Sequence, residues 1–173
     1  MIIKSIGGNL MSTEKNLAAA FAGESQANRK YLAFAKQADA EGYLQVAKLF
    51  RAAAEAETIH ALSHFKTLGM IKSTAENLKA AIDGETYEFT NMYPDFIKEA
   101  QAENNAAAVR TFTYANDAEK VHADLYQKAL DHLEKGVDGE YYLCTVCGHI
   151  AEDHAPDTCP ICKAKAQAYT NVG

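Results

Sequence analysis

The residues best suited to chemistry form a Glu-x-x-His pattern that occurs twice in the chain. Glu57 and His60 are three residues apart, and Glu119 and His122 repeat this spacing. Residues at this separation leave the same face of a helix, one turn apart, so each pair presents a carboxylate and an imidazole together. One such pair is common by chance, but its repetition indicates the ligands of a metal centre.

Carboxylates on two other predicted helical stretches extend this ligand set. Glu24 lies in the first stretch, and Glu85 and Glu88 lie in the third. In four-helix bundles that bind two metal ions, two helices each supply a glutamate and the other two supply Glu-x-x-His motifs, all pointing inward. A buried carboxylate without a partner is costly, whereas shared cations satisfy several carboxylates at once. The sequence therefore predicts a di-metal site, and this mixture of oxygen and imidazole donors favours a di-iron centre.

Four cysteines form a second candidate metal site near the C-terminus. The first 143 residues contain no cysteine, and the last thirty contain two Cys-x-x-Cys pairs separated by eleven residues: Cys144, Cys147, Cys159 and Cys162. Paired knuckles of this kind are typical of tetrahedral metal coordination, and their spacing suits zinc and iron equally. We expect a mononuclear iron, with zinc as a possible substitute, because a neighbouring redox site needs a one-electron donor and zinc cannot act as one.

The remaining histidines and two tyrosines have more modest interpretations. Tyr31 and Tyr93 lie one or two turns from a predicted ligand, so their phenols are candidates to donate hydrogen bonds to a ligating carboxylate. His64 lies one turn beyond His60, and we expect a hydrogen-bonded core histidine there. The other three histidines are expected on the surface: His132, His149 and His154.

Four helical stretches are predicted to position these residues. Their apolar residues recur at intervals of three and four, which is typical of bundle helices. Pro94 is expected to kink or break the third stretch just after Tyr93. The stretches run from Ser12 to a stop at Gly42, from Leu44 to Leu68 with a stop at Gly69, from a Ser73–Glu76 capping box onward, and from about Asn105 to Lys135.

The link between the second and third stretches restricts the topology. A 25-residue helix is about 37 Å long, whereas the five residues from Gly69 to Ser73 reach at most about 17 Å. Parallel neighbours would require a link that travels most of a helix length. Either the two stretches are antiparallel, or the two halves of the bundle come from different subunits of a helix-exchanged homodimer.

Length and composition exclude several classes of protein. The chain has 173 residues, 48% of them hydrophobic and 23% charged, with a net charge of −6. We predict a leader at residues 1–12, a four-helix di-iron domain at 13–136 and a four-cysteine domain at 137–173. No basic patch suggests nucleic acid, and no signal peptide or membrane-length apolar run is present. We therefore expect a cytoplasmic protein, in which paired cysteines bind metal rather than form disulfides.

The order of these motifs resembles that of the rubrerythrin family, which implies a mainly helical fold: a ferritin-like four-helix bundle followed by a small rubredoxin-like domain. The resemblance covers the chain after residue 12, and plain ferritins lack both the extra carboxylate corresponding to Glu88 and the cysteine module. One departure is Lys163, since rubredoxin-like sites usually have glycine there at a positive φ, and lysine implies modest strain. The matching segments are Phe21-Ala22-Gly23-Glu24, Glu57-Thr58-Ile59-His60, Glu85-Thr86-Tyr87-Glu88, Met92-Tyr93-Pro94 and Glu119-Lys120-Val121-His122, followed by the cysteine pairs.

The resemblance implies a role for each ligand. Glu57 and Glu119 would bridge two irons, Glu24 would be a terminal ligand of one, and Glu85 with His122 would be terminal on the other. In this family the first iron moves between two further ligands, which here are Glu88 in the oxidised state and His60 in the reduced state. Family members with a similarly short link exchange helices in a dimer.

The resemblance also implies a peroxidase that protects against oxidative stress. It would reduce hydrogen peroxide with electrons that come from NAD(P)H through a redox partner, either rubredoxin or a flavoprotein reductase. Two alternatives remain open: a ferritin-like ferroxidase that handles iron, and an electron-transfer metalloprotein without catalysis. The cysteine module argues against iron storage, where it has no use.

Overall fold

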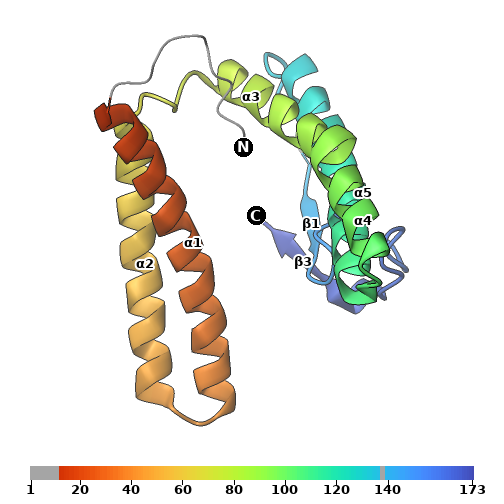
Figure 1. The fold of residues 1–173 in the computed structure, drawn as a ribbon. Coiled ribbons are helices and arrows are strands. Elements are labelled where there is room, and N and C mark those ends of the chain that lie inside the picture. The colour runs from red at the N-terminus through yellow and green to blue at the C-terminus, as the bar shows by residue number, and fades with distance from the viewer. Residues whose placement is uncertain (1–11, 137–138) are drawn as a thin grey trace. The chain divides into compact units, whose positions relative to one another are not determined.

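The computed structural model describes residues 12–136 and 139–173, which form two compact units. One unit ends at Lys72 and consists of two helices, and the other begins at Ser73 and contains the remaining elements (Figure 1). Most of the predicted leader lies outside the described residues, and Ser12 begins the first helix. Within the described part, no helix combines the length and apolar character needed to cross a membrane.

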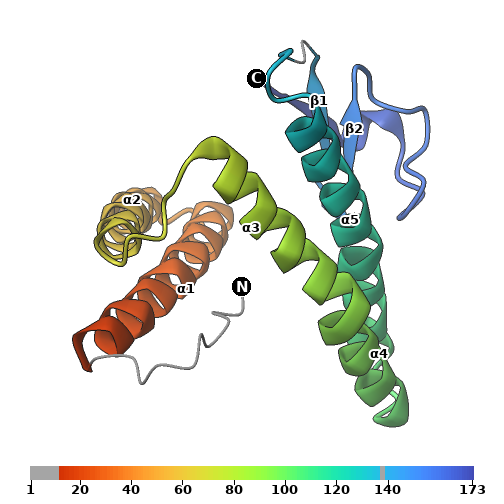
Figure 2. The same cartoon turned by 90° about the horizontal axis from the view of Figure 1, so that it is seen from above.

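The first unit is an antiparallel hairpin of α1 (Ser12–Ala40) and α2 (Leu44–Thr67), which lie side by side in Figures 1 and 2. The predicted stop at Gly42 is confirmed, because this residue takes a φ of 82° in the turn between the helices. Asn28 joins the helices from inside by donating to the Ala54 carbonyl at 2.7 Å and to Thr58 Oγ1 at 2.8 Å. These bonds satisfy a buried polar side chain and fix the register of α1 on α2.

A continuous helical rod begins the second unit. It comprises α3 (Thr74–Tyr87), the π-helix η1 (Glu88–Met92) and α4 (Tyr93–Ala102). The predicted capping box is present, since Ser73 Oγ accepts from the Glu76 amide and the Glu76 carboxylate accepts from the Ser73 amide.

The effect of Pro94 differs from the prediction. The helical winding changes before the proline, at η1, where the Tyr93 amide donates to the Glu88 carbonyl, and the chain continues as helix to Ala102. Pro94 then occupies the first turn of α4, where a missing N–H costs little. Single π-turns inside helices are frequent at functional sites, and this one begins at a predicted ligand, Glu88.

The last helix, α5 (Ala106–Asp131), packs along α3 and α4 (Figure 2). Asn105 caps it by accepting a hydrogen bond from the Ala108 amide at 3.1 Å. The helix ends at Asp131, four residues before the predicted end at Lys135, and turns follow. The rings of Phe96 and Phe112 join α4 to α5 with centroids 5.6 Å apart.

The C-terminal part is a small antiparallel sheet carrying two cysteine loops. The sheet order is β2-β1-β3, with β1 (Tyr141–Cys144), β2 (Ile150–Glu152) and β3 (Tyr169–Val172), and a 3-10 turn η2 (Ala166–Ala168) precedes β3. The predicted fold class is therefore confirmed: a mainly helical ferritin-like part followed by a small four-cysteine domain. The predicted domain boundaries stay a prediction.

Candidate metal centres

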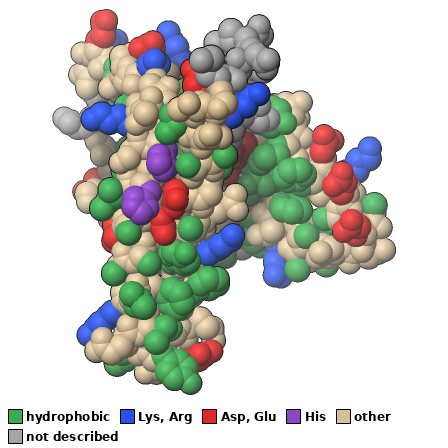
Figure 3. All heavy atoms as spheres, turned by 60° about the vertical axis from the view of Figure 1, so that its left-hand side comes forward, with side chains coloured by type: hydrophobic (Ala, Val, Ile, Leu, Met, Phe, Trp, Pro, Cys, Tyr) green, Lys and Arg blue, Asp and Glu red, His purple; other side chains and the backbone are tan. Residues whose placement is uncertain are grey.

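The first cluster of possible ligands lies on the α1–α2 hairpin. His60 Nδ1 is 3.1 Å from Glu57 Oε2 and 3.9 Å from Glu24 Oε2, so one carboxylate from α1 joins the Glu-x-x-His pair of α2. The His60 side chain is 56% exposed, whereas that of Glu57 is 18% exposed. Figure 3 brings this side of the molecule forward, and histidine and acidic side chains lie together there among hydrophobic ones.

The two carboxylates of this cluster compete for one proton. The hydrogen bond with Glu57, followed by burial, raises the pKa of Glu24. The same hydrogen bond, and a second one with His60, lower the pKa of Glu57. Like charges this close favour a shared proton, and a cation in the same place would stabilise both carboxylates without it.

The second cluster lies on α3 and α5. Glu85, Glu119 and His122 place their ligand atoms within 4.8 Å of one another, and His122 Nδ1 is 2.7 Å from Glu119 Oε2. Both members of this Glu-x-x-His pair are better shielded than their counterparts on α2, at 16% and 18% side-chain exposure for His122 and Glu119. The structure thus brings six of the seven predicted di-iron ligands into two groups of three.

Burial and hydrogen bonds together shift the pKa values of this cluster, and not all in one direction. It raises the pKa of Glu85 to about 7, and the neighbouring Glu119 carboxylate adds to the effect. Burial also opposes ionisation of Glu119, but hydrogen bonds with His122 and Glu85 outweigh it and lower the pKa of Glu119. The bond with Glu119 raises the pKa of His122. A positive ion at this place would stabilise the ionised carboxylates. Carboxylate and imidazole groups together are also a donor set that suits iron.

A backbone carbonyl from the cysteine domain sets the tautomer of His122. His122 Nε2 is 2.9 Å from the carbonyl oxygen of Gly148, which can only accept a hydrogen bond. Nε2 therefore carries the proton, and in the neutral ring Nδ1 presents its lone pair to the Glu119 cluster. A metal-binding histidine commonly has such a partner on its other nitrogen. The same bond ties α5 to the residue that follows Cys147.

Several predicted residues lie outside the two groups of three. Glu88, at the start of η1, raises the pKa of Glu85 and of Tyr93 through its charge, so it lies beside the second cluster. Burial is the main cause of the raised pKa of Tyr93. The Tyr31 ring packs against Phe50 with centroids 6.1 Å apart, and its role as a donor to a ligand stays a prediction.

Two further residues lie near the clusters, and the hydrogen-bonded core role expected of His64 stays a prediction. Tyr126, one turn beyond His122 on α5, has a pKa raised by burial and by Glu85 and Glu119; its four-residue spacing from His122 is the signal that could have revealed it. His64 is near enough to Glu24 to lower the pKa of that carboxyl slightly, as the last of several influences.

The four cysteines converge as predicted. Cys144 Sγ is 3.7 Å from Cys162 Sγ, and Cys147 Sγ is 3.6 Å from Cys159 Sγ. A disulfide would bring two sulfurs to about 2.05 Å, whereas a tetrahedron of thiolates about 2.3 Å from a metal has edges of about 3.8 Å. All four are free cysteines, and the donor geometry fits a tetrahedral metal ion.

Two details of the knuckles bear on the predictions. Lys163 adopts the positive φ expected at its position, 64°, and its Nζ donates to the Pro160 carbonyl at 2.6 Å.

The expectation that His149 lies on the surface is wrong, because this residue is only 8% exposed. The turn at Gly148, with φ 82°, directs the chain inward, and the His149 carbonyl accepts from the Cys144 amide at 2.8 Å. His132 and His154 are exposed, as predicted.

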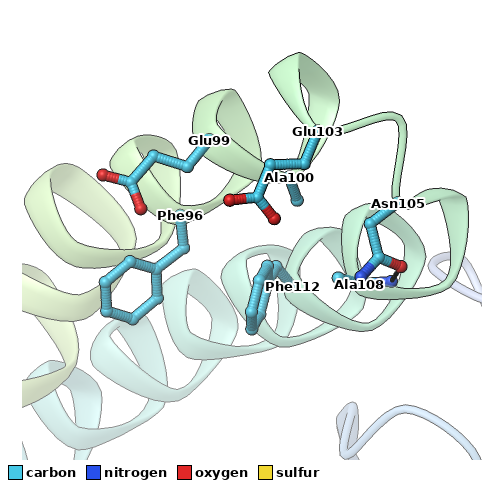
Figure 4. Close-up of a pocket in the computed structure, with 7 residues that line it drawn as sticks. All are labelled: Phe96, Glu99, Ala100, Glu103, Asn105, Ala108 and Phe112. Atoms are coloured by element: carbon cyan, nitrogen blue, oxygen red, sulfur yellow. Dashed lines mark hydrogen bonds between the residues drawn. The ribbon is translucent and has the colours of Figure 1, made fainter.

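A cavity of about 320 Å³ between α4 and α5 lies apart from the predicted ligands (Figure 4). Phe96 and Phe112 form its apolar wall, and Glu99 of α4 and Glu103, which caps the end of α4, also line it. None of the predicted metal ligands lines this cavity.

Comparison with known proteins identifies the family. The rubrerythrin family model matches residues 15–130, and the model of the rubrerythrin rubredoxin-like domain matches residues 142–170. Nigerythrin of Nitratidesulfovibrio vulgaris is 42% identical over an alignment that covers 92% of this chain and 86% of that protein. Rubrerythrin of Porphyromonas gingivalis is 40% identical, with 96% and 91% covered.

A solved structure of nigerythrin in a partially reduced state is also similar. It matches with a TM-score of 0.58 and 38% identity, over 99% of this chain and 92% of that one. The metal sites predicted from the sequence, a di-iron site and a four-cysteine site, are those of the matched family domains. The chain belongs to the rubrerythrin family.

Proposed function

We propose that this protein is a non-haem di-iron peroxidase that reduces hydrogen peroxide to water. Its electrons would come from NAD(P)H through a redox partner protein and enter by the four-cysteine iron. The observation that carries the proposal is the hydrogen bond between His122 and Gly148, which joins a carboxylate–imidazole cluster directly to a cysteine knuckle. Family membership supports the same redox class.

The two clusters would together hold one pair of irons. In this assignment Glu57 and Glu119 bridge the metals, Glu24 is terminal on the first iron, and Glu85 with His122 is terminal on the second. The remaining pair, Glu88 and His60, would exchange as ligands of the first iron. The location of Glu88 at a π-turn supports this exchange, since single π-turns inside helices are frequent at functional sites.

When bound, the two irons supply one electron each for cleavage of the O–O bond. The overall reaction consumes hydrogen peroxide, two electrons and two protons and yields two waters. The protein's part is to hold those protons close to the substrate. Glu88, at the start of the π-turn, would pass a proton to the substrate when it is not a ligand of the first iron. Burial and the charges of Glu88, Glu119 and Glu85 raise the pKa of Tyr93, so its phenol stays protonated, and we expect it to donate to one of these carboxylates.

We further propose that the complete centre forms in a helix-exchanged homodimer in the cytoplasm. The five-residue link is too short for parallel halves, and the α1–α2 hairpin leaves large apolar side chains in solvent. Leu49 and Ile59 of α2 are 68% and 65% exposed, and Leu62 is 55% exposed. Burial of such a face against a second chain is the ordinary reason for its composition.

Iron loading followed by peroxide turnover tests the proposal. The anaerobically loaded protein should consume hydrogen peroxide in the presence of a reducing system. Glu57→Ala should abolish turnover while the visible spectrum of the four-cysteine iron persists. Rapid oxidation of Fe(II) by O2 with storage of many irons per chain would instead indicate a ferritin-like protein. Zinc in the four-cysteine site without peroxide turnover would indicate a metalloprotein without catalysis.

A further inference from the structure

A buried histidine and a tyrosine form a pair beside the four-cysteine site. His149 Nδ1 lies 2.8 Å from the hydroxyl oxygen of Tyr169, and the two rings meet edge to face with centroids 6.0 Å apart. His149 is 8% exposed. No metal-binding role was expected for either residue, and neither belongs to the four-cysteine cluster.

The sheet directs Tyr169 toward the sulfur atoms. Tyr169 in β3 is directly opposite Cys144 in β1, and opposite residues of an antiparallel pair extend their side chains on the same face. The Tyr169 hydroxyl hydrogen-bonds to Cys159. The backbone amides of Cys162 and Ile161 hydrogen-bond to the same residue.

The direction of each hydrogen bond follows from the number of protons. The phenol hydroxyl of Tyr169 carries one proton, which it can give to only one neighbour. A metal-bound thiolate has no proton and only accepts. The hydroxyl proton therefore goes to Cys159, and His149 must present Nδ1–H to the tyrosine oxygen.

We propose that His149 and Tyr169 form a two-step hydrogen-bond relay that ends on the Cys159 sulfur and raises the reduction potential of the four-cysteine iron. Reduction adds one negative charge to the centre, so a donor to sulfur stabilises the reduced state more than the oxidised one. Hydrogen bonds to ligating sulfur are an established means of setting such potentials. Tyr169 contacts the ligand, and His149 is a positioning residue that acts through it. The inference rests on the part of the proposed function that places iron at these cysteines.

The direct test is a redox titration of the iron-loaded full-length protein carrying Tyr169→Phe. The variant should be harder to reduce, with about a tenfold loss in the equilibrium constant, which for one electron is about 59 mV. Tyr142→Phe is the matched control: it removes a hydroxyl of the same sheet that donates to Glu140 at 2.6 Å, and it should leave the potential unchanged. An unchanged potential in Tyr169→Phe would overturn the proposal.

Removal of the histidine tests the second step. His149→Phe keeps an aromatic ring and should shift the potential in the same direction by a smaller amount. In the Tyr169→Phe background, His149→Phe should cause no additional shift in the reduction potential, because the relay is already broken. Additive shifts would show that the histidine acts independently and would contradict the relay.

The tautomer of His149 supplies a readout that requires neither iron nor peroxide. In the zinc-loaded protein, nitrogen NMR should place the proton of a neutral His149 on Nδ1. A proton on Nε2 alone would show that Tyr169 donates to His149 instead, and the proposal would fail. All these measurements are made without peroxide, so a failure of the peroxidase proposal leaves their result interpretable.

Discussion

The two kinds of predicted metal site in this chain differ in how far apart their ligands lie in the sequence. The four cysteines come from nineteen consecutive residues, and Cys144 and Cys159 are 1% and 0% exposed. The predicted di-iron ligands come from helices in two separate units, and the His60 side chain is 56% exposed. A site formed within one short segment is preorganised by its own turns, whereas a site divided between helices depends on their assembly. The four-cysteine site should therefore persist under changes that abolish the di-iron site.

The largest effects should come from loss of one site without the other. Cys159→Ser should remove the mononuclear iron and lower peroxide turnover with the protein reductant at least about a hundredfold, because electrons lose their entry point. Iron bound at the carboxylate clusters should remain. Metal analysis with visible spectroscopy, together with the reciprocal variant Glu57→Ala, checks this independence. Loss of both irons in either variant would show that the two sites do not form independently.

A charge on the exposed face of α2 should disrupt the di-iron site and leave the four-cysteine site intact. Ile59→Glu places a carboxylate on an apolar surface that we expect a second chain to cover, so it should weaken dimerisation and lower di-iron loading about tenfold or more. The four-cysteine spectrum should be unchanged. Sedimentation and iron analysis provide the measurement. Lys48→Glu, also exposed on α2, controls for added negative charge. A monomer that still binds both irons would refute the exchanged dimer.

Acid should weaken metal uptake at the carboxylate clusters. Because the folded-state pKa of Glu85 is raised from 4.5 to about 7, the fold without metal favours the protonated carboxyl, and its stability decreases as pH rises through this window. Metal requires the carboxylate, so affinity should increase over the same window, by about tenfold between pH 6 and 8 for this one proton. Isothermal titrations with Co(II) in buffers of different ionisation enthalpy measure both affinity and proton release. Affinity that is independent of pH would contradict the cause assigned to this shift.

The smallest effect should come from the one departure in the cysteine knuckle. Lys163→Gly relieves a non-glycine residue at φ 64° but loses the 2.6 Å bond to Pro160 and makes the unfolded chain more flexible. These contributions oppose one another, so the free energy of unfolding should change by less than about 1 kcal/mol. Thermal unfolding of the metal-loaded protein checks this. A loss of metal binding would show that the lysine is essential to the knuckle.

The parts of the fold that depend on local chemistry could be predicted from the sequence. The stops at Gly42 and Gly69 require a positive φ, and the Ser73–Glu76 box satisfies helix ends within four residues. Each Glu-x-x-His pair follows from spacing along one helix, and the four-cysteine cluster follows from two Cys-x-x-Cys pairs. Their ligand groups accordingly appear where they were expected.

The parts that depend on packing could not be predicted in this way. In the π-turn at Glu88–Met92, a backbone amide bonds to a carbonyl five residues back instead of four, ahead of Pro94. No residue type in this segment predicts that change. The burial of His149 could not be predicted, because the sequence around the cysteines has no periodicity that distinguishes buried from exposed positions. Its burial follows from the turn at Gly148 and the pairing of β1 with β2 and β3. The same absence of a pattern concealed its bond to Tyr169.

Mössbauer spectroscopy of the anaerobically loaded protein tests the central claim most directly. If the glutamate and histidine clusters jointly hold a metal pair, the spectrum should show two irons with oxygen and nitrogen ligands for every iron with four sulfur ligands. In Glu57→Ala the signal of the pair should disappear, and that of the sulfur-ligated iron should remain. A spectrum of the unaltered protein that contains only sulfur-ligated iron would contradict the account.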